Sequence, residues 1–209
     1  MEQLQRISLV CFLRVFTKNE VSVDKMMNES LGPVWHRSQK SRGIIPKGLR
    51  GVDKEANWGV SASDGWVYGH GSLSIVVNSK KHAFLGLFRY MPNNGNEAKA
   101  MYEETMKIAE IKTVSMDGKA DNIDLFYDMK RNEKTLITTP RRNRKRSSER
   151  RSAMIDFLES PKIRAKYKER GIYVEPMQGI VKDIFDLDKC WMRGAENNRW
   201  IFGAMGVAV

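Results

Sequence analysis

Two long apolar runs in the first half of the chain limit its fold more than any other feature. The first covers Trp66–Val77 and ends in three β-branched residues, and the second covers His82–Met91 and is nearly all apolar. Both have the length and composition of strands, and a turn of Pro, Asn and Gly residues follows at Pro92–Gly95. We expect a hairpin through Asn78–Ser79, so the chain must be built around a sheet.

The rest of the chain alternates between helical and strand patterns. Asn96 is a candidate N-cap for a helix to Ile111, in which apolar residues recur at helical spacing. Pro161 and Pro176 are expected to interrupt the late helical region. The other expected elements are strands at 20–24, 113–116 and 134–139 and helices at 123–131, 153–158 and 163–185. This order predicts an α/β fold with a mixed five-stranded sheet and flanking helices.

The chain is strongly basic, and the excess charge is concentrated in one segment. Its 209 residues include 36 Lys and Arg against 25 Asp and Glu, for a net charge of +11. Residues 141–170 hold twelve of the cations and four of the anions, a net of +8. The stretch 141–151 has no apolar residue and is expected to be an exposed basic arm. Such an arm favours nucleic-acid binding, and a solvated charge run is the alternative.

Other features exclude several classes of protein. Cys11 and Cys190 lie far apart, which excludes a disulfide scaffold and a zinc ribbon and favours a reducing compartment. The three histidines have no metal-ligand spacing. The apolar stretch Leu9–Leu13 is ended by Arg14 and is too short for a membrane span or a signal peptide. We therefore expect an amphipathic N-terminal helix, no membrane partner and a cytoplasmic, nucleoid-associated location.

Three acidic residues stand where a sheet of this order would bring them together. Asp24 ends the first expected strand, Asp117 ends the strand after the first crossover helix, and Glu175 lies on the late helix. In open α/β sheets the functional crevice lies beyond the carboxyl ends of the strands. Three carboxylates there can hold two Mg²⁺ ions for phosphodiester displacement. Each residue taken alone is more often an ordinary surface carboxylate.

Three sequence blocks sharpen this hypothesis. They are Asp24-Lys25-Met26-Met27 leading to Trp35-His36, the stretch Gly51–Ser61 with Gly65–Gly69, and Asp117–Asp121 followed by Leu125-Phe126. With them the chain resembles the DDE transposases of bacterial insertion sequences from about Val21 to Gly194. In that family the second Asp opens an Asp-x-x-Tyr-Asp pattern, and Ala120 takes the aromatic position here. The resemblance implies a ribonuclease-H-like fold.

A further block in the late helix resembles the Tyr, Arg, Glu and Lys signature that closes the catalytic domain of these transposases. Its residues are Tyr167, Arg170, Glu175 and Lys182, and the last two are seven residues apart, about two helical turns on one face. The resemblance implies that Asp24, Asp117 and Glu175 are catalytic and bind two Mg²⁺ or Mn²⁺ ions. The residues expected to contact DNA are Arg141, Arg142, Arg144, Lys145, Arg146, Tyr167, Arg170 and Lys182.

The implied function is metal-dependent DNA cleavage and strand transfer by an insertion-sequence transposase. Its expected partner is double-stranded DNA, as element ends and as target, with a homodimer on DNA as the expected assembly. Residues 1–19 are expected to be an N-terminal helix left from an upstream end-recognition region, and residues 20–209 the catalytic domain. The alternatives are a plain metal-dependent nuclease and an inactive fragment that only binds DNA.

The identity of the first catalytic Asp is a separate question. Asp53 and Asp64 flank the block around Trp58 and are rival candidates for that position. We prefer Asp24 because a strand precedes it and the Trp-His block follows it.

Overall fold

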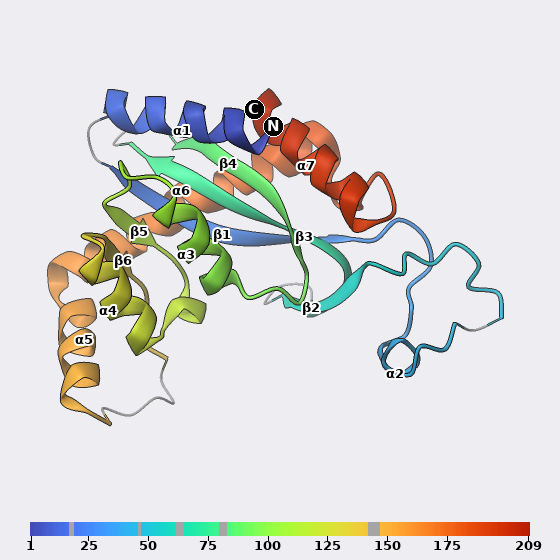
Figure 1. Cartoon of the computed structure of the whole chain (residues 1–209), viewed down its shortest axis with the longest axis horizontal. Coiled ribbons are helices and arrows are strands. Elements are labelled where there is room, and N and C mark those ends of the chain that lie inside the picture. Colours follow the sequence, from blue (N-terminus) through green and yellow to red (C-terminus); the bar gives the residue numbers. More distant parts are fainter. Residues whose placement is uncertain (17–18, 46, 62–64, 80–82, 142–146) are drawn as a thin grey trace.

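The computed structural model describes residues 1–16, 19–45, 47–61, 65–79, 83–141 and 147–209 (Figure 1). Within these ranges the chain forms a mixed α/β fold with a six-stranded sheet and seven α-helices. The strands are β1 Glu20–Glu29, β2 Asn57–Ser61, β3 Gly65–Asn78, β4 Ala83–Pro92, β5 Thr113–Ser115 and β6 Thr135–Ile137. The helices are α1 Glu2–Phe16, α2 Arg37–Ser41, α3 Glu97–Met106, α4 Ile123–Arg131, α5 Glu149–Glu159, α6 Pro161–Phe185 and α7 Ala195–Ala208, with a short 3₁₀ helix η1 at Gly118–Ala120.

The long strand β3 organises the sheet. It pairs antiparallel with β1, β2 and β4. Beyond β1, the strands β5 and β6 run parallel to it, so the order is β2-β3-β1-β5-β6 with β4 also on β3. The expected hairpin is formed by β3 and β4, in which Asn78 pairs with Ala83. Every residue of β3 from Val67 to Asn78 is buried, as in a strand with both faces covered.

Helices cover both faces of the sheet. In Figure 1, α3 lies in front of the strands and α6 passes behind them. One apolar core joins α1, α3, α4 and α5 to the sheet, and its residues include Leu9, Leu13, Met101, Phe126, Met154 and Ile75. The other joins α6 and α7 to the opposite face, and its residues include Val174, Met177, Phe202, Val76 and Phe88. Neighbouring residues of β3 therefore point into different cores, as the period of a strand requires.

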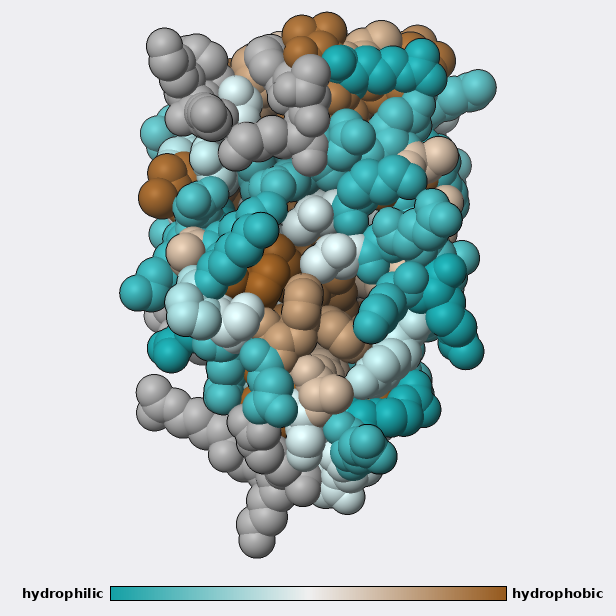
Figure 2. Space-filling model, turned by 90° about the vertical axis from the view of Figure 1, so that its left-hand side faces the viewer, coloured by the Kyte–Doolittle hydropathy of each residue, from teal (hydrophilic) through white to brown (hydrophobic). Residues whose placement is uncertain are grey.

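The excursion between β1 and β2 carries a small core of its own, with α2 at the right of Figure 1. Its buried residues are Trp35, Val52, Ala56 and Tyr68. The indole of Trp35 donates to the carbonyl of Ile44 at 2.8 Å, and that of Trp58 donates to the carbonyl of Trp35 at 2.9 Å. The opposite end of the molecule, formed by α4 and α5, is mostly hydrophilic with apolar residues gathered at its middle (Figure 2).

Most expected elements are present with shifted ends, and three expectations are wrong. Asp24 was expected to end the first strand, but β1 continues to Glu29 and Asp24 lies within it. The sheet has a sixth strand, β2, which is only five residues long and has a single buried position, so its pattern is weak. The helix α6 continues through Pro176 without the expected interruption. Both Pro176 and Ile172 are exposed, so the Ile172 carbonyl that loses its helical partner can bond to water.

Candidate functional site

Asp24, Asp117 and Glu175 line one cavity of about 480 Å³, together with Arg170 and Lys182. The three carboxylates come from β1, from the loop after β5 and from α6. The parallel register of β1 and β5 aligns Ser22 with Ser115, and Asp24 and Asp117 each lie two residues further along. The cavity therefore lies at the carboxyl end of this strand pair, where the strand order predicted a crevice.

Asp24 is held by few partners. Its Oδ1 accepts the backbone N–H of Lys25 at 2.9 Å, and its Oδ2 pairs with Arg170 Nη2 at 3.0 Å. Burial raises the pKa of Asp24 above its ordinary value, the Arg170 guanidinium opposes this rise, and the nearby Asp117 carboxylate adds to it. The folded protein thus places a carboxylate where its charged form is disfavoured.

Asp117 is positioned by the short helix that follows it. It is the N-cap of η1, and its Oδ1 accepts the backbone N–H of Lys119 at 3.0 Å. Its own carbonyl accepts a hydrogen bond from Thr138 Oγ1 at 2.6 Å, which ties the loop to the end of β6. An Asp before a Gly-Lys pair is a common N-cap, so the local sequence explains this geometry.

Glu97 joins these two residues, although no pattern in the sequence pointed to it. Asp24, Glu97 and Asp117 each offer an oxygen, and the three oxygens lie within 4.8 Å of one another. Glu97 is the first residue of α3, directly after the N-cap Asn96. An acidic residue in a first helical turn is common because it complements the helix dipole, so nothing in the pattern marked it. The only available signal was its place at the start of the helix that follows β4.

Two lysines surround the Glu97 carboxylate. Its Oε1 pairs with Lys119 Nζ at 2.6 Å and lies 3.7 Å from Lys25 Nζ. Burial raises the pKa of Glu97, and the Lys119 and Lys25 ammonium groups oppose that rise. Burial also lowers the pKa of Lys25, with Glu97 acting in the opposite direction. Positive and negative groups therefore balance within the site.

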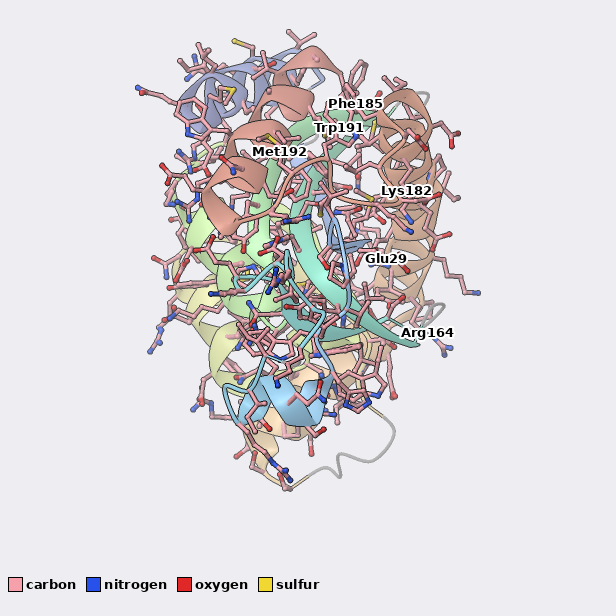
Figure 3. All side chains as sticks on the ribbon, turned by 90° about the vertical axis from the view of Figure 1, so that its right-hand side faces the viewer. Glu29, Arg164, Lys182, Phe185, Trp191 and Met192 are labelled. Carbon is pink, nitrogen blue, oxygen red and sulfur yellow. The ribbon has the colours of Figure 1, made fainter. Side chains whose placement is uncertain are left out.

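The helix α6 supplies the remaining side chains of the cavity. Glu175 is exposed and does not belong to the group of three close carboxylates. Arg170 has only 12% of its side chain exposed, and its Nε is buried with no hydrogen-bond partner in the described part of the chain. Lys182 lies toward the other end of α6 from Arg164 (Figure 3) and is 4.0 Å from Asp188 Oδ1. Arg170 and Lys182 thus place two cations on the cavity.

The expected DNA-binding arm is described only at its ends, because Arg142, Arg144, Lys145 and Arg146 lie outside the described residues. At one end, the Arg141 backbone N–H donates to Asp121 Oδ2 at 2.9 Å and its Nε donates to the Gly118 carbonyl at 2.8 Å. The arm therefore starts beside Asp117. At the other end the expectation of exposure is wrong, because Arg151 belongs to α5 and is buried against Asp121.

Tyr167 lies next to the cavity but lines a different one. That cavity, of about 410 Å³, is also lined by Thr138, Arg164 and Lys168. Burial raises the pKa of Tyr167, the Arg170 charge opposes the rise, and the charges of Asp117 and Asp24 add to it. The phenol therefore remains protonated and can donate a hydrogen bond near the acidic cluster.

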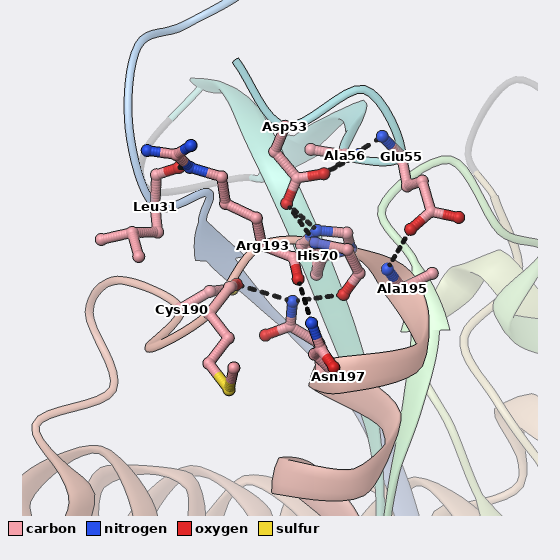
Figure 4. A network of polar contacts seen from close by, with 12 residues as sticks. Leu31, Asp53, Glu55, Ala56, His70, Cys190, Arg193, Ala195 and Asn197 are labelled. Carbon is pink, nitrogen blue, oxygen red and sulfur yellow. Dashed lines mark hydrogen bonds and ion pairs between the residues drawn. The ribbon is translucent and has the colours of Figure 1, made fainter. Parts of the chain in front are cut away.

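Asp53, the rival for the first catalytic Asp, lies in a second polar cluster that does not line the cavity (Figure 4). Its Oδ2 pairs with His70 Nε2 and accepts the backbone N–H of Gly194, both at 2.8 Å. Its Oδ1 accepts the backbone N–H groups of Glu55 and Ala56. Asp53 thus joins the excursion, β3 and the start of α7. Asp64, the other rival, lies outside the described residues.

The acidic cluster is suited to a divalent cation. Mg²⁺ and Mn²⁺ are bound by oxygen ligands, and Asp24, Glu97 and Asp117 offer three of them at close range. Glu97 Oε2 is buried and has no hydrogen-bond partner among the described residues, so it has a free coordination position. The triad therefore lies close enough to bind a metal ion.

Comparison of the chain with protein-family models, with curated proteins and with solved structures found no match. Among the helices within the described ranges, none is both long and apolar enough to cross a membrane.

Proposed function

We propose that this protein is a DDE-type transposase that cleaves DNA and joins the resulting 3′-hydroxyl to a target with the help of Mg²⁺ or Mn²⁺. One observation carries the proposal. Asp24, Asp117 and Glu175, from three separate elements, line one cavity with Arg170 and Lys182. These are the residues that the sequence resemblance assigned to metal binding and to the scissile phosphate.

The sheet order supports a ribonuclease-H-like fold as part of this proposal. Three antiparallel strands, β1, β3 and β4, are followed by β5 and β6 parallel to β1. The helix α3 joins the two groups of strands, and α6 packs on the opposite face. The short strand β2 extends this arrangement by pairing with the first residues of β3, Gly65–Gly69.

The residues of the site have separate tasks in the proposed reaction. Asp24, Asp117 and Glu175 would hold the metal ions, which supply an activated oxygen nucleophile and charge stabilisation at the phosphate. Arg170 and Lys182, which both line the cavity, would each contact a phosphate of the DNA, the first through its guanidinium group and the second as a point charge. Water would attack the phosphorus at the element end and break its bond to the 3′-oxygen, which leaves as a 3′-hydroxyl. That hydroxyl would then attack a target phosphorus and displace the target's own 3′-oxygen, so no side chain would form a covalent bond to DNA.

A cleavage and joining assay tests the proposal. Purified protein is incubated with labelled duplex DNA and Mn²⁺, and both nicked and joined products are measured. We expect metal-dependent products that are lost in Asp24→Asn, Asp117→Asn and Glu175→Gln. Binding without any cut would support the inactive DNA-binding alternative, and nicks without joining would support the plain nuclease.

The basic arm provides an independent test of the DNA partner. Replacing Arg144, Lys145 and Arg146 by Gln should reduce the slope of log affinity against log salt by roughly two to three, at about 0.9 per phosphate contact. The loss should be the same for any duplex sequence, because contacts to phosphate carry no base information. An unchanged slope would indicate that the arm is a solvated charge run.

A further inference from the structure

Glu97 is buried in a way that its local sequence does not require. A first-turn glutamate normally reaches solvent, whereas Glu97 is only 5% exposed. Its Oε2 accepts no hydrogen bond within the described ranges. A buried carboxylate oxygen without a partner is costly, and native proteins retain few of them. This oxygen is available to a ligand.

The two lysines beside Glu97 differ in how firmly they are held. Lys25 has 3% of its side chain exposed, and its ammonium group donates to the carbonyl of Asn93. Lys119 has 46% of its side chain exposed, so it can turn into solvent at little cost. Both approach the same oxygen, Oε1, and neither is within bonding distance of Oε2. Lys119 is therefore the group that can leave.

Charge balance favours the position of the Lys119 ammonium group beside Glu97 while no metal is bound. Three carboxylates that each place an oxygen within 4.8 Å of the others repel, and Arg170 pairs with Asp24 while Lys25 lies 3.7 Å from Glu97. The hydrogen bond and charge of Glu97 outweigh burial and raise the pKa of Lys119 above its ordinary value. A divalent cation at the same place would meet the three oxygens and replace this single positive charge.

We propose that Glu97 is a ligand of the cation shared by Asp24 and Asp117, and that the Lys119 ammonium group occupies this place when the cation is absent. The inference rests on the metal site of the proposed function and adds to it a fourth carboxylate and a displaceable lysine. Glu175 lines the cavity with Asp24 and Asp117 but stands outside the close triad, whereas Glu97 lines the neighbouring cavity that shares Lys25 and Lys119 with it. Glu97 then has a function beyond that of a counter-ion for buried Lys25.

Binding of Mn²⁺ to the full chain without DNA tests this assignment, measured by electron paramagnetic resonance of the free ion. Glu97→Gln should weaken Mn²⁺ binding at least tenfold, about 1.4 kcal/mol. The matched control is Glu104→Gln on the same helix, because Glu104 is also buried and pairs with Arg6, Arg89 and Lys107. This control should lose stability without losing affinity for Mn²⁺. Equal loss in both variants would show a general structural effect and overturn the assignment.

A second variant keeps the test valid if Glu97→Gln does not fold. Lys119→Met removes the half-exposed ammonium group and should tighten Mn²⁺ binding at least threefold. Lys182→Met removes the same charge from another part of the cavity and should tighten it less. Equal tightening would mean that Lys119 acts only through long-range charge, and the proposed displacement would be wrong.

The outcome for Asp24→Asn and Asp117→Asn separates the two proposals. If these variants lose Mn²⁺ binding while Glu97→Gln retains it, the inference about Glu97 fails and the proposed function keeps its metal site. If all three variants bind Mn²⁺ like the unmodified chain, the metal site of the proposed function fails as well.

Discussion

Two aspartates that were rivals for one role lie in opposite environments. Asp53 accepts four hydrogen bonds, from Glu55, Ala56, His70 and Gly194. Asp24 is bonded by one backbone N–H and one guanidinium, and it lines an open cavity beside two further carboxylates. Both are acidic residues of the early chain, yet each oxygen of Asp53 accepts two hydrogen bonds, whereas each oxygen of Asp24 has one partner.

The pKa directions follow from this contrast. Burial acts to raise the pKa of Asp53, but the hydrogen bonds from His70, Gly194 and Glu55 outweigh it and hold the pKa below its ordinary value. Burial raises the pKa of Asp24, and Arg170 only partly offsets the rise. An acid whose charge is fully compensated stabilises the fold, whereas one that is under-compensated in a cavity is available to a ligand. The following substitutions test that division.

The largest effect is expected for Asp24→Asn. If Asp24 holds a metal ion, DNA cleavage should fall by at least about 10³-fold, roughly 4 kcal/mol of transition-state stabilisation. The free energy of unfolding should change by less than about 1 kcal/mol, because the lost charge was disfavoured in the folded state. Single-turnover cleavage and urea unfolding measure the two quantities. A variant that is strongly destabilised would show that Asp24 is a structural residue like Asp53.

The second-largest effect is expected for Asp53→Asn, which should lower the stability of the fold. All four groups around the carboxylate donate, so an amide nitrogen at this site faces an N–H instead of an acceptor. Removing one partner of such a buried pair lowers the free energy of unfolding by about 3 kcal/mol. Urea unfolding measures this loss of unfolding free energy. The control is Asp183→Asn on the exposed face of α6, which should change the free energy of unfolding by less than about 0.5 kcal/mol. Cleavage per folded molecule should be retained, and its loss would bring Asp53 back as a catalytic candidate.

The pH dependence of these variants should have opposite signs. The pKa of Asp53 in the folded protein is below its ordinary value of 3.8, so its contribution to stability is present above that value and lost as pH falls through the folded pKa. The folded pKa of Asp24 is above 3.8, so its contribution is present below that value and lost as pH rises through the folded pKa. With a chelator present, Asp53→Asn should cost more at pH 7 than at pH 3, and Asp24→Asn more at pH 3. The same sign for both would contradict the contrast.

The sequence could predict the parts of this molecule that depend on local pattern. The hairpin of β3 and β4 follows from two apolar runs and a short gap, and the N-cap at Asn96 follows from residue type. The meeting of Asp24 and Asp117 follows from their equal distance, two residues, beyond the last aligned pair of the parallel strands β1 and β5, although Asp24 lies within β1 and does not end it. Each of these needed only the period of an element and the place where it stops.

What the sequence could not predict depends on long-range contacts. Glu97 looks like any first-turn glutamate, and its burial results from the approach of Lys25 and Lys119 from distant elements. Asp53 and His70 are seventeen residues apart in the chain, and the Gly194 amide comes from the far end. No spacing rule relates such residues, since the tertiary fold alone brings them together.

The smallest effect is expected at the edge of the Asp53 cluster, in Tyr68→Phe. Tyr68 is 3% exposed and its hydroxyl donates to the Asp53 carbonyl, while burial and the Asp53 charge raise its pKa to about 12. Loss of this buried bond should cost about 1 kcal/mol, because the carbonyl is left without its donor. Tyr127→Phe is the matched control, since that hydroxyl donates at 2.9 Å to the Arg150 carbonyl in an exposed bond that water can replace. The control should cost less than about 0.5 kcal/mol, and neither variant should change cleavage. If the two costs are equal, the hydrogen bonds around Asp53 contribute no more than surface bonds, and the distinction between a structural and a functional aspartate must rest on the cavity alone.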